Sequence, residues 1–240
     1  MEKNELLYEG KAKRIYATEE TGVLWVEYKD SATAFNGVKK SEITGKGILN
    51  NEISSLIFAN LQEMGVESHF IRKISETEQL VKQVSIIPLE VVTRNVIAGS
   101  LAKRLGIEEG TPLKKPVVEF YYKNDELGDP IITEDHIEIL GIASLEEVNL
   151  LRKKAIKINE VLLELFLQLG IRLVDFKLEF GKDANGEILL ADEISPDTCR
   201  LWDVKTNEKL DKDVFRRDLG DLKTVYTEIL NRLKGVTAHV

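Results

Sequence analysis

The chain of 240 residues is long enough to bury a full hydrophobic core, either as one large domain or as two lobes. With 43% hydrophobic and 31% charged residues, it has the composition of an ordinary soluble globular protein. Its formal net charge of −8 argues against a general affinity for nucleic acid or anionic membranes, so an anionic ligand must be bound by local clusters of basic residues.

Membrane segments and disulfides are not expected. The N-terminal stretch MEKNELLYEG has no apolar segment, and no apolar run approaches the roughly 18 residues of a membrane-spanning helix. We therefore expect a cytoplasmic protein. Cys199 is the single cysteine, which excludes an internal disulfide and a thiolate metal cage.

The first hundred residues are predicted to be mostly extended. Short apolar runs bounded by polar residues predict strands at residues 6–8, 14–17, 23–28, 70–74, 80–85 and 89–93. One helix interrupts them at residues 48–64, where apolar residues recur at helical spacing and Gly65 offers a stop.

Helices dominate the later part of the chain. Gly99–Ser100 is expected to open a short helix that ends near residue 105. Ser144 and Glu147 form a capping box, which begins an amphipathic helix that ends at Gly170. The last helix is predicted at residues 212–234.

This order of elements predicts an α+β fold with two lobes, because strands precede helices with little regular alternation. Pro88 lies where the pattern changes, and proline is restricted within central strands. We therefore predict a β-rich N-terminal lobe at residues 1–86 and an α+β C-terminal lobe at residues 87–240.

Charged residues alternate with apolar ones in the segment LVDFKLEFG. Asp175, Lys177 and Glu179 share one face of the predicted strand, while Val174, Phe176, Leu178 and Phe180 take the other. The sequence therefore predicts a strand with one apolar face and one charged face.

A hairpin is expected to bring two carboxylates together. Asn185–Gly186 favours a two-residue type I′ turn, and counting outward from it sets Glu179 opposite Asp192. At an effective dielectric constant near 20 their repulsion is roughly 3 kcal/mol, so a cation must relieve it or one carboxyl must hold a proton. Mg²⁺ is the natural candidate. The alternative is a solvent-exposed hairpin whose charges never meet.

Basic residues gather at two further places. Gly10, Lys11 and Lys13 lie between two short strands, where a glycine turn with adjacent lysines suits a phosphate. Arg94 ends a strand shortly before Ser100, so a guanidinium, a hydroxyl and free helix N–H groups could meet one anion. The alternatives are a solvated charged hairpin at the first place, and an N-cap serine beside a surface arginine at the second.

The remaining polar groups differ in what they indicate. Asp197 and Arg200 follow the hairpin in a loop at a strand end, which is a favoured place for ligands. Lys123, Asp125 and Asp129 are interpreted as a polar surface turn. No pair of the three histidines has metal-ligand spacing, so the chemistry is expected to belong to carboxylates, lysines and arginines.

Four segments together resemble the SAICAR synthetase family, the phosphoribosylaminoimidazole-succinocarboxamide synthases. They are GKAKRIY, IPLEVVTRNVIAGS, LVDFKLEFG and ADEISPDTCRLWD. The resemblance runs from about residue 7 to residue 233. It implies two α+β lobes with ATP in the cleft between them, distantly like protein kinases.

The resemblance also implies an activity. Members join L-aspartate to the carboxylate of carboxyaminoimidazole ribonucleotide through an acyl phosphate, using ATP and Mg²⁺, and so make SAICAR in de novo purine biosynthesis. We expect small-molecule partners only and a homodimer. The alternatives are a kinase-like phosphotransferase and a nucleotide-binding regulator without catalysis.

Roles in the family carry over to matching positions. The resemblance assigns the ATP phosphates to Gly10, Lys11, Ala12 and Lys13, and the border of the adenine to the segment around Lys82 to Pro88. It assigns the metal to Glu179 and Asp192. It assigns the 5′-phosphate of the nucleotide substrate to Arg94, Ser100 and Arg200, and the imidazole and ribose to Asp175, Lys177 and Asp197. Catalytic roles are expected for Lys13, Asp175 and Lys177, and Gly128 stands where many members have a histidine.

Overall fold

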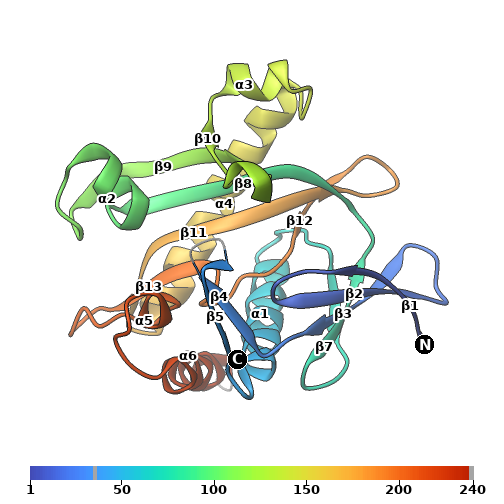
Figure 1. Ribbon diagram of the computed structural model, residues 1–240, viewed down its shortest axis with the longest axis horizontal. Coiled ribbons are helices and arrows are strands. Elements are labelled where there is room, and N and C mark those ends of the chain that lie inside the picture. Colours follow the sequence, from blue (N-terminus) through green and yellow to red (C-terminus); the bar gives the residue numbers. More distant parts are fainter. Residues whose placement is uncertain (35–36, 238–240) are drawn as a thin grey trace.

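The computed structural model describes residues 1–34 and 37–237, which form two large antiparallel sheets with helices packed against them (Figure 1). The elements of the N-terminal part are β1 (Lys3–Glu9), β2 (Lys13–Thr18), β3 (Val23–Tyr28), β4 (Ser31–Ala34), β5 (Lys39–Glu42), α1 (Lys46–Glu63), β6 (Phe70–Lys73) and β7 (Glu78–Lys82). The expected strand-rich beginning with a single helix is confirmed.

The rest of the chain contains both strands and helices. Its elements are β8 (Ser85–Val96), α2 (Gly99–Leu105), β9 (Pro112–Tyr122), the 3₁₀ helix η2 (Asp125–Leu127), β10 (Ile131–Ile132), α3 (Glu134–Ile139), α4 (Leu145–Gln168), β11 (Ile171–Lys182), β12 (Ile188–Ala191), β13 (Cys199–Asp203), α5 (Asp213–Arg216) and α6 (Leu222–Thr237). The predicted α+β fold is thereby confirmed.

The N-terminal sheet has five strands in the order β1-β2-β3-β7-β6. The glycine turn at Gly10 joins β1 to β2 at one edge, as expected. Helix α1 packs against β3, β6 and β7. It ends just before Gly65, whose φ of 74° lies in the left-handed region that glycine tolerates, so the predicted stop is confirmed.

The second sheet has the order β10-β9-β8-β11-β12, and β13 also pairs with β11. Strand β8 continues through Pro88, which was expected to limit a strand. Its pairing with β11 shifts register between Glu90 and Ile86, so the proline, which has no N–H to donate, lies in an irregular stretch. At Gly181 a Cβ atom would lie 2.5 Å from Val84, so only glycine lets β8 approach β11 this closely.

The helices predicted at residues 99–105 and 144–170 are confirmed as α2 and α4, whereas α3 was not predicted and the last helix differs from the prediction. Helix α4 begins with the predicted capping box of Ser144 and Glu147. The prediction of a single helix at residues 212–234 is wrong, because the structure has two helices there, α5 and α6. Asp221 explains the division: its carboxylate accepts a hydrogen bond from the backbone N–H of Thr224 at 2.9 Å, which begins a new helix.

One large hydrophobic cluster joins both parts of the fold. Fully buried side chains of α1, α4, β11 and α6 contribute to it, including Ile53, Phe166, Phe176 and Tyr226. Because α1 belongs to this cluster, the N-terminal sheet is held against the helices of the C-terminal part. No helix of the described residues is long and apolar enough to span a membrane.

Candidate active site

Strand β11 presents the charged residues of the site on one face. Asp175, Lys177 and Glu179 alternate with Phe176 and Phe180, which lie in the hydrophobic core. The predicted division into a charged and an apolar face is confirmed over this stretch. One strand therefore carries three charged side chains at regular spacing.

The predicted alternation fails at Val174. The pairing of β11 with β13 is irregular between Leu173 and Asp175, and this bulge turns Val174 away from the main core. Val174 instead joins a small separate cluster with Val96, Ala98 and Trp202.

The two-residue turn predicted at Asn185–Gly186 is wrong. The backbone N–H of Asp183 donates to the carbonyl of Glu187 at 3.0 Å, which closes a loop of three residues. The Asp183 carboxylate also accepts two backbone N–H groups, both at 2.9 Å, and so stabilises this longer loop. The additional residue moves the register by one position, and Glu179 pairs with Ala191.

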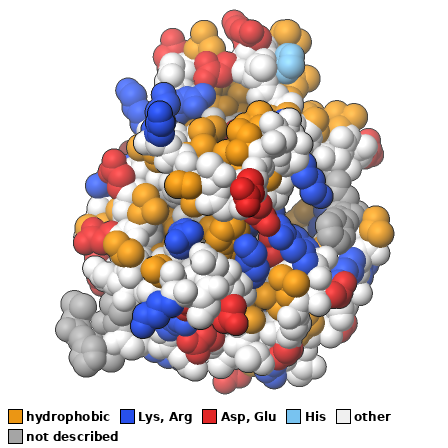
Figure 2. All heavy atoms as spheres, turned by 90° about the vertical axis from the view of Figure 1, so that its left-hand side faces the viewer, with side chains coloured by type: hydrophobic (Ala, Val, Ile, Leu, Met, Phe, Trp, Pro, Cys, Tyr) orange, Lys and Arg blue, Asp and Glu red, His pale blue; other side chains and the backbone are white. Residues whose placement is uncertain are grey.

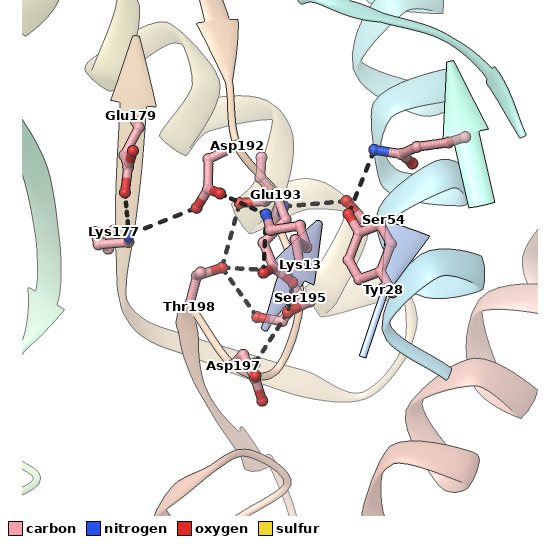
Figure 3. Close-up of polar contacts among 12 residues, drawn as sticks. Lys13, Tyr28, Ser54, Lys177, Glu179, Asp192, Glu193, Ser195, Asp197 and Thr198 are labelled. Atoms are coloured by element: carbon pink, nitrogen blue, oxygen red, sulfur yellow. Dashed lines mark hydrogen bonds and ion pairs between the residues drawn. The ribbon is translucent and has the colours of Figure 1, made fainter. Parts of the chain in front are cut away.

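Asp192 nevertheless comes to the same side as Glu179. It follows the end of β12 with a φ of 62°, a left-handed conformation that redirects the chain. The ring of His69 donates from Nε2 to the Asp192 carbonyl at 3.2 Å. Lys177 Nζ lies 2.5 Å from Glu179 Oε1 and 3.5 Å from Asp192 Oδ2, so one ammonium group contacts both carboxylates (Figure 3).

Lysine side chains balance the charge of these carboxylates. Lys13 Nζ contacts Asp192 Oδ1 at 2.5 Å and Glu193 Oε1 at 3.1 Å. Lys123 Nζ contacts Glu179 Oε1 at 2.8 Å. The repulsion that was expected to need a cation is therefore relieved by ammonium groups of the chain itself.

The electrostatics of this lysine–carboxylate cluster keep Lys177 and Asp192 ionised. Burial disfavours the charged form of Lys177, but Glu179, Asp192 and Glu90 outweigh it and hold its pKa well above the usual value. Burial likewise opposes ionisation of Asp192, but Lys13 and Lys177 lower its pKa overall. Lys177 and Asp192 are thus charged at neutral pH.

Only part of the predicted phosphate turn reaches this cluster. Lys13, the first residue of β2, is in it, whereas Lys11 is half exposed and pairs with Asp125 at 2.8 Å. Gly10 donates its N–H to the Lys13 carbonyl at 2.8 Å and closes the turn that includes Ala12. Lys11 therefore bridges from the N-terminal sheet to η2 beside the site.

Lys82 lies elsewhere. Its side chain lines a cavity with Lys154 and Lys157, which belong to α4. The structure does not bring it next to Lys13, and its expected place beside an adenine stays a prediction.

Arginine side chains form a second cluster around Asp175. Arg94 donates to Asp175 Oδ2 at 2.8 Å and to Ser100 Oγ at 3.1 Å. Arg200 donates to the same Asp175 oxygen at 2.9 Å and to Asp213 Oδ2 at 3.1 Å. The structure therefore brings together Arg94, Ser100 and Arg200, the three positions predicted to bind one anion.

Gly99 is required for this arrangement. Its φ is 54°, and a Cβ atom there would lie 2.5 Å from Nη2 of Arg200. Among the described residues, this Nη2 atom has no hydrogen-bond partner. The guanidinium therefore lies directly against the start of α2, where an anion could also meet backbone N–H groups.

Figure 2 shows that basic and acidic side chains are interspersed on the side of the molecule that carries α2 and α5.

Asp197 belongs to neither cluster directly. It is buried and contacts Lys46 at 2.6 Å, the Tyr226 hydroxyl at 2.5 Å and Lys212 at 3.4 Å. Its backbone N–H donates to Ser195 Oγ, which in turn donates to a carboxylate oxygen of Glu193. The contacts of Asp197 therefore join α1 and α6 to the loop that follows β12.

Comparison with known proteins identifies the family. The model of the SAICAR synthetase family matches residues 6–233. The chain belongs to the SAICAR synthetase family. It is 68% identical over 237 residues to the phosphoribosylaminoimidazole-succinocarboxamide synthase of Bacillus cytotoxicus, covering 99% of both chains.

Solved structures of SAICAR synthetases have the same fold. The enzyme from Ehrlichia chaffeensis superposes with a TM-score of 0.93 at 50% identity, and the match covers 96% of this chain and 98% of that one. A SAICAR synthetase in complex with ADP gives a TM-score of 0.93 at 53% identity, with the same coverage. The predicted enzyme class, an ATP-dependent ligase of de novo purine biosynthesis, is therefore confirmed, and neither alternative is favoured.

Sequence reasoning missed several residues of this candidate site. Lys123 was interpreted as part of a surface turn, yet it contacts Glu179 from the end of β9. Glu90 lies 3.3 Å from Lys177, and its place in an alternating strand could have indicated this. His69 and Glu193 gave no sequence signal, because their positions depend on how distant segments pack.

The lowered pKa of the buried His69 should make the stability of the fold depend on pH. Burial, and then the charge of Lys13, lower its pKa from 6.5 to about 4. Because the folded-state pKa lies below the unfolded one, His69 contributes stability above pH 6.5 that is lost as the pH falls toward 4. Replacing His69 by Gln keeps an amide N–H donor but removes the titration. Between pH 7 and pH 5 the free energy of unfolding should fall by about 2 kcal/mol more in the unsubstituted protein than in His69→Gln. Urea unfolding at both pH values tests this, and equal losses would contradict it.

Proposed function

We propose that the charged face of β11 is the place where this enzyme joins L-aspartate to carboxyaminoimidazole ribonucleotide. One observation carries the proposal. The same face of strand β11 carries Asp175, Lys177 and Glu179. Asp175 accepts hydrogen bonds from both arginines, and the other two residues belong to the lysine–carboxylate cluster. Four residues of a strand span roughly 13 Å. A single nucleotide substrate could therefore reach from the arginines to the site of phosphoryl transfer.

The arginine cluster would hold the 5′-phosphate of the nucleotide substrate. Arg94 and Arg200 supply planar groups of donors that match phosphate oxygens, and Ser100 adds a hydroxyl. Asp175 accepts hydrogen bonds from both guanidinium groups, which supports a positioning role for it. The expected catalytic role of Asp175 stays a prediction.

The reaction needs the substrate carboxylate to be activated. A carboxylate is a poor electrophile, and transfer of a phosphoryl group from ATP turns one of its oxygens into a leaving group. The amine of aspartate then attacks the acyl phosphate, and ADP and phosphate leave. Lys13 and Lys177 would stabilise the negative charge of the transferring group, because both remain protonated beside the site.

The residues at this site fit the Mg²⁺ that the chemistry implies. Glu179 and Asp192 are hard oxygen donors whose carboxylates contact one ammonium group. No group of three or more acidic, His or Cys side chains within residues 1–34 and 37–237 is arranged to hold a metal. Mg²⁺ is commonly bound by one or two carboxylates together with substrate phosphates, so two are sufficient. Bound there, the ion would offset repulsion between ATP and the substrate carboxylate.

The division of the chain into two lobes is a further part of this proposal. The N-terminal sheet ends at Lys82 and the second sheet begins at Ser85, which supports lobes at residues 1–86 and 87–240.

Ile15 and Leu24 are partly buried aliphatic residues of the N-terminal sheet and could pack against the adenine of ATP. The homodimer and the cytoplasmic location stay predictions.

An assay of ADP release with one substrate omitted at a time tests the activity. ADP should form only when ATP, aspartate and carboxyaminoimidazole ribonucleotide are all present with Mg²⁺. A kinase-like phosphotransferase would not require aspartate, and a regulator would release no ADP under any condition. ADP release that persists without aspartate would overturn the proposal.

A further inference from the structure

A cavity of about 700 Å³ lies behind the hairpin of β11 and β12. Phe180 and Leu190 line it, and each is buried on the side of the sheet that α4 covers. Phe180 directly follows Glu179 in the strand, so the two side chains point to opposite faces. The cavity is therefore separated by the sheet from the lysine–carboxylate cluster around Glu179.

Three lysines line this cavity. Lys82 comes from the end of β7, and Lys154 and Lys157 come from α4. Lys154 is half-buried and Lys82 and Lys157 are exposed, and within the part of the chain that the structure describes none of the three forms an ion pair. Glu67 is the one acidic residue among those lining the cavity. In a protein of net charge −8, this cavity is a local concentration of positive charge.

The remaining walls are largely apolar. Val66, Phe70 and Ile158 line the cavity together with the two residues of the hairpin. Cavities of roughly 300 to 1,000 Å³ with apolar walls and a few polar groups are typical of sites for small organic ligands. Lysine ammonium groups beside aromatic walls suit a ligand with both an anionic group and a flat apolar body.

We propose that this cavity is a second ligand site, which binds an organic phosphate of about the size of a mononucleotide. The phosphate would meet Lys154 and Lys157, and the apolar body would pack against Phe70 and Phe180. Of the cavity's residues, Lys82 alone is also expected to border the adenine of ATP, and the proposal does not depend on the reaction proposed above.

Calorimetric titration with 1-naphthyl phosphate tests the proposal. The protein is first saturated with ADP and Mg²⁺ so that the catalytic cleft is occupied. We expect one binding event per chain, and at least a tenfold weaker one in Lys154→Met/Lys157→Met. Lys153→Met is the matched control, because Lys153 is exposed on the same helix and does not line the cavity. It should bind like the unsubstituted protein.

Three results would overturn the proposal. They are the absence of binding at millimolar probe, binding only when ADP is left out, and equal affinity in the double variant and the control. Lys154→Glu/Lys157→Glu provides a second test if the methionine variant does not fold, and it should bind at least as weakly. Unchanged ADP affinity in both double variants would show that the catalytic cleft is intact.

Discussion

Replacing Asp192 by Asn should lower the kcat for ADP release at least about 100-fold, while the protein remains folded. The substitution removes one of the three carboxylates that contact Lys177. Among the described residues, it leaves Lys13 with Glu193 as its only carboxylate partner. If Mg²⁺ is held at this place, the concentration needed for half-maximal activity should also rise. ADP release measured over a range of Mg²⁺ concentrations checks both effects.

Glu187→Gln is the matched control for this variant. Glu187 is exposed in the same hairpin, and among the described residues it forms no ion pair. Its substitution removes one negative charge from the same hairpin without touching the cluster. Unchanged kcat and Mg²⁺ dependence in Asp192→Asn would contradict the metal assignment, and equal losses in both variants would point to a general charge effect.

Replacing Lys46 by Met should lower the free energy of unfolding by about 3 kcal/mol. Lys46 is 1% exposed at the first position of α1, and its partner Asp197 has a side chain that is 5% exposed. Without the ammonium group, Asp197 stays buried with the more distant Lys212 and the hydroxyl of Tyr226. Breaking one side of a buried ion pair leaves a charge without compensation, which is the reason for the large effect.

Urea unfolding of Lys46→Met measures this loss of free energy of unfolding, and Lys73→Met is the matched control. Lys73 pairs with Glu52 near the surface, and its side chain is 36% exposed. Exposed ion pairs contribute about 1 kcal/mol or less, so the control should unfold at nearly the original urea concentration. Losses of the same small size in both variants would show that the Lys46–Asp197 pair does not hold α1 in place.

Local signals in the sequence determined much of this protein. The alternation in LVDFKLEFG produced the charged face of β11, and the capping box at Ser144 and Glu147 marked the beginning of α4. Gly10 marked the turn between β1 and β2. These features depend on residues a few positions apart, so the chain chemistry at each place is sufficient to predict them. The four family segments added the candidate residues.

Only the tertiary structure decided which residues meet. Asp183 stabilises a longer loop than Asn185–Gly186 predicts, and because the side-chain period of a strand is two, the shift of one residue changes every partner in the hairpin. The left-handed conformation of Asp192 then returns its carboxylate to Lys177. His69 contacts Asp192 across 123 positions of sequence, and such contacts arise from packing of distant segments, which short-range patterns do not encode.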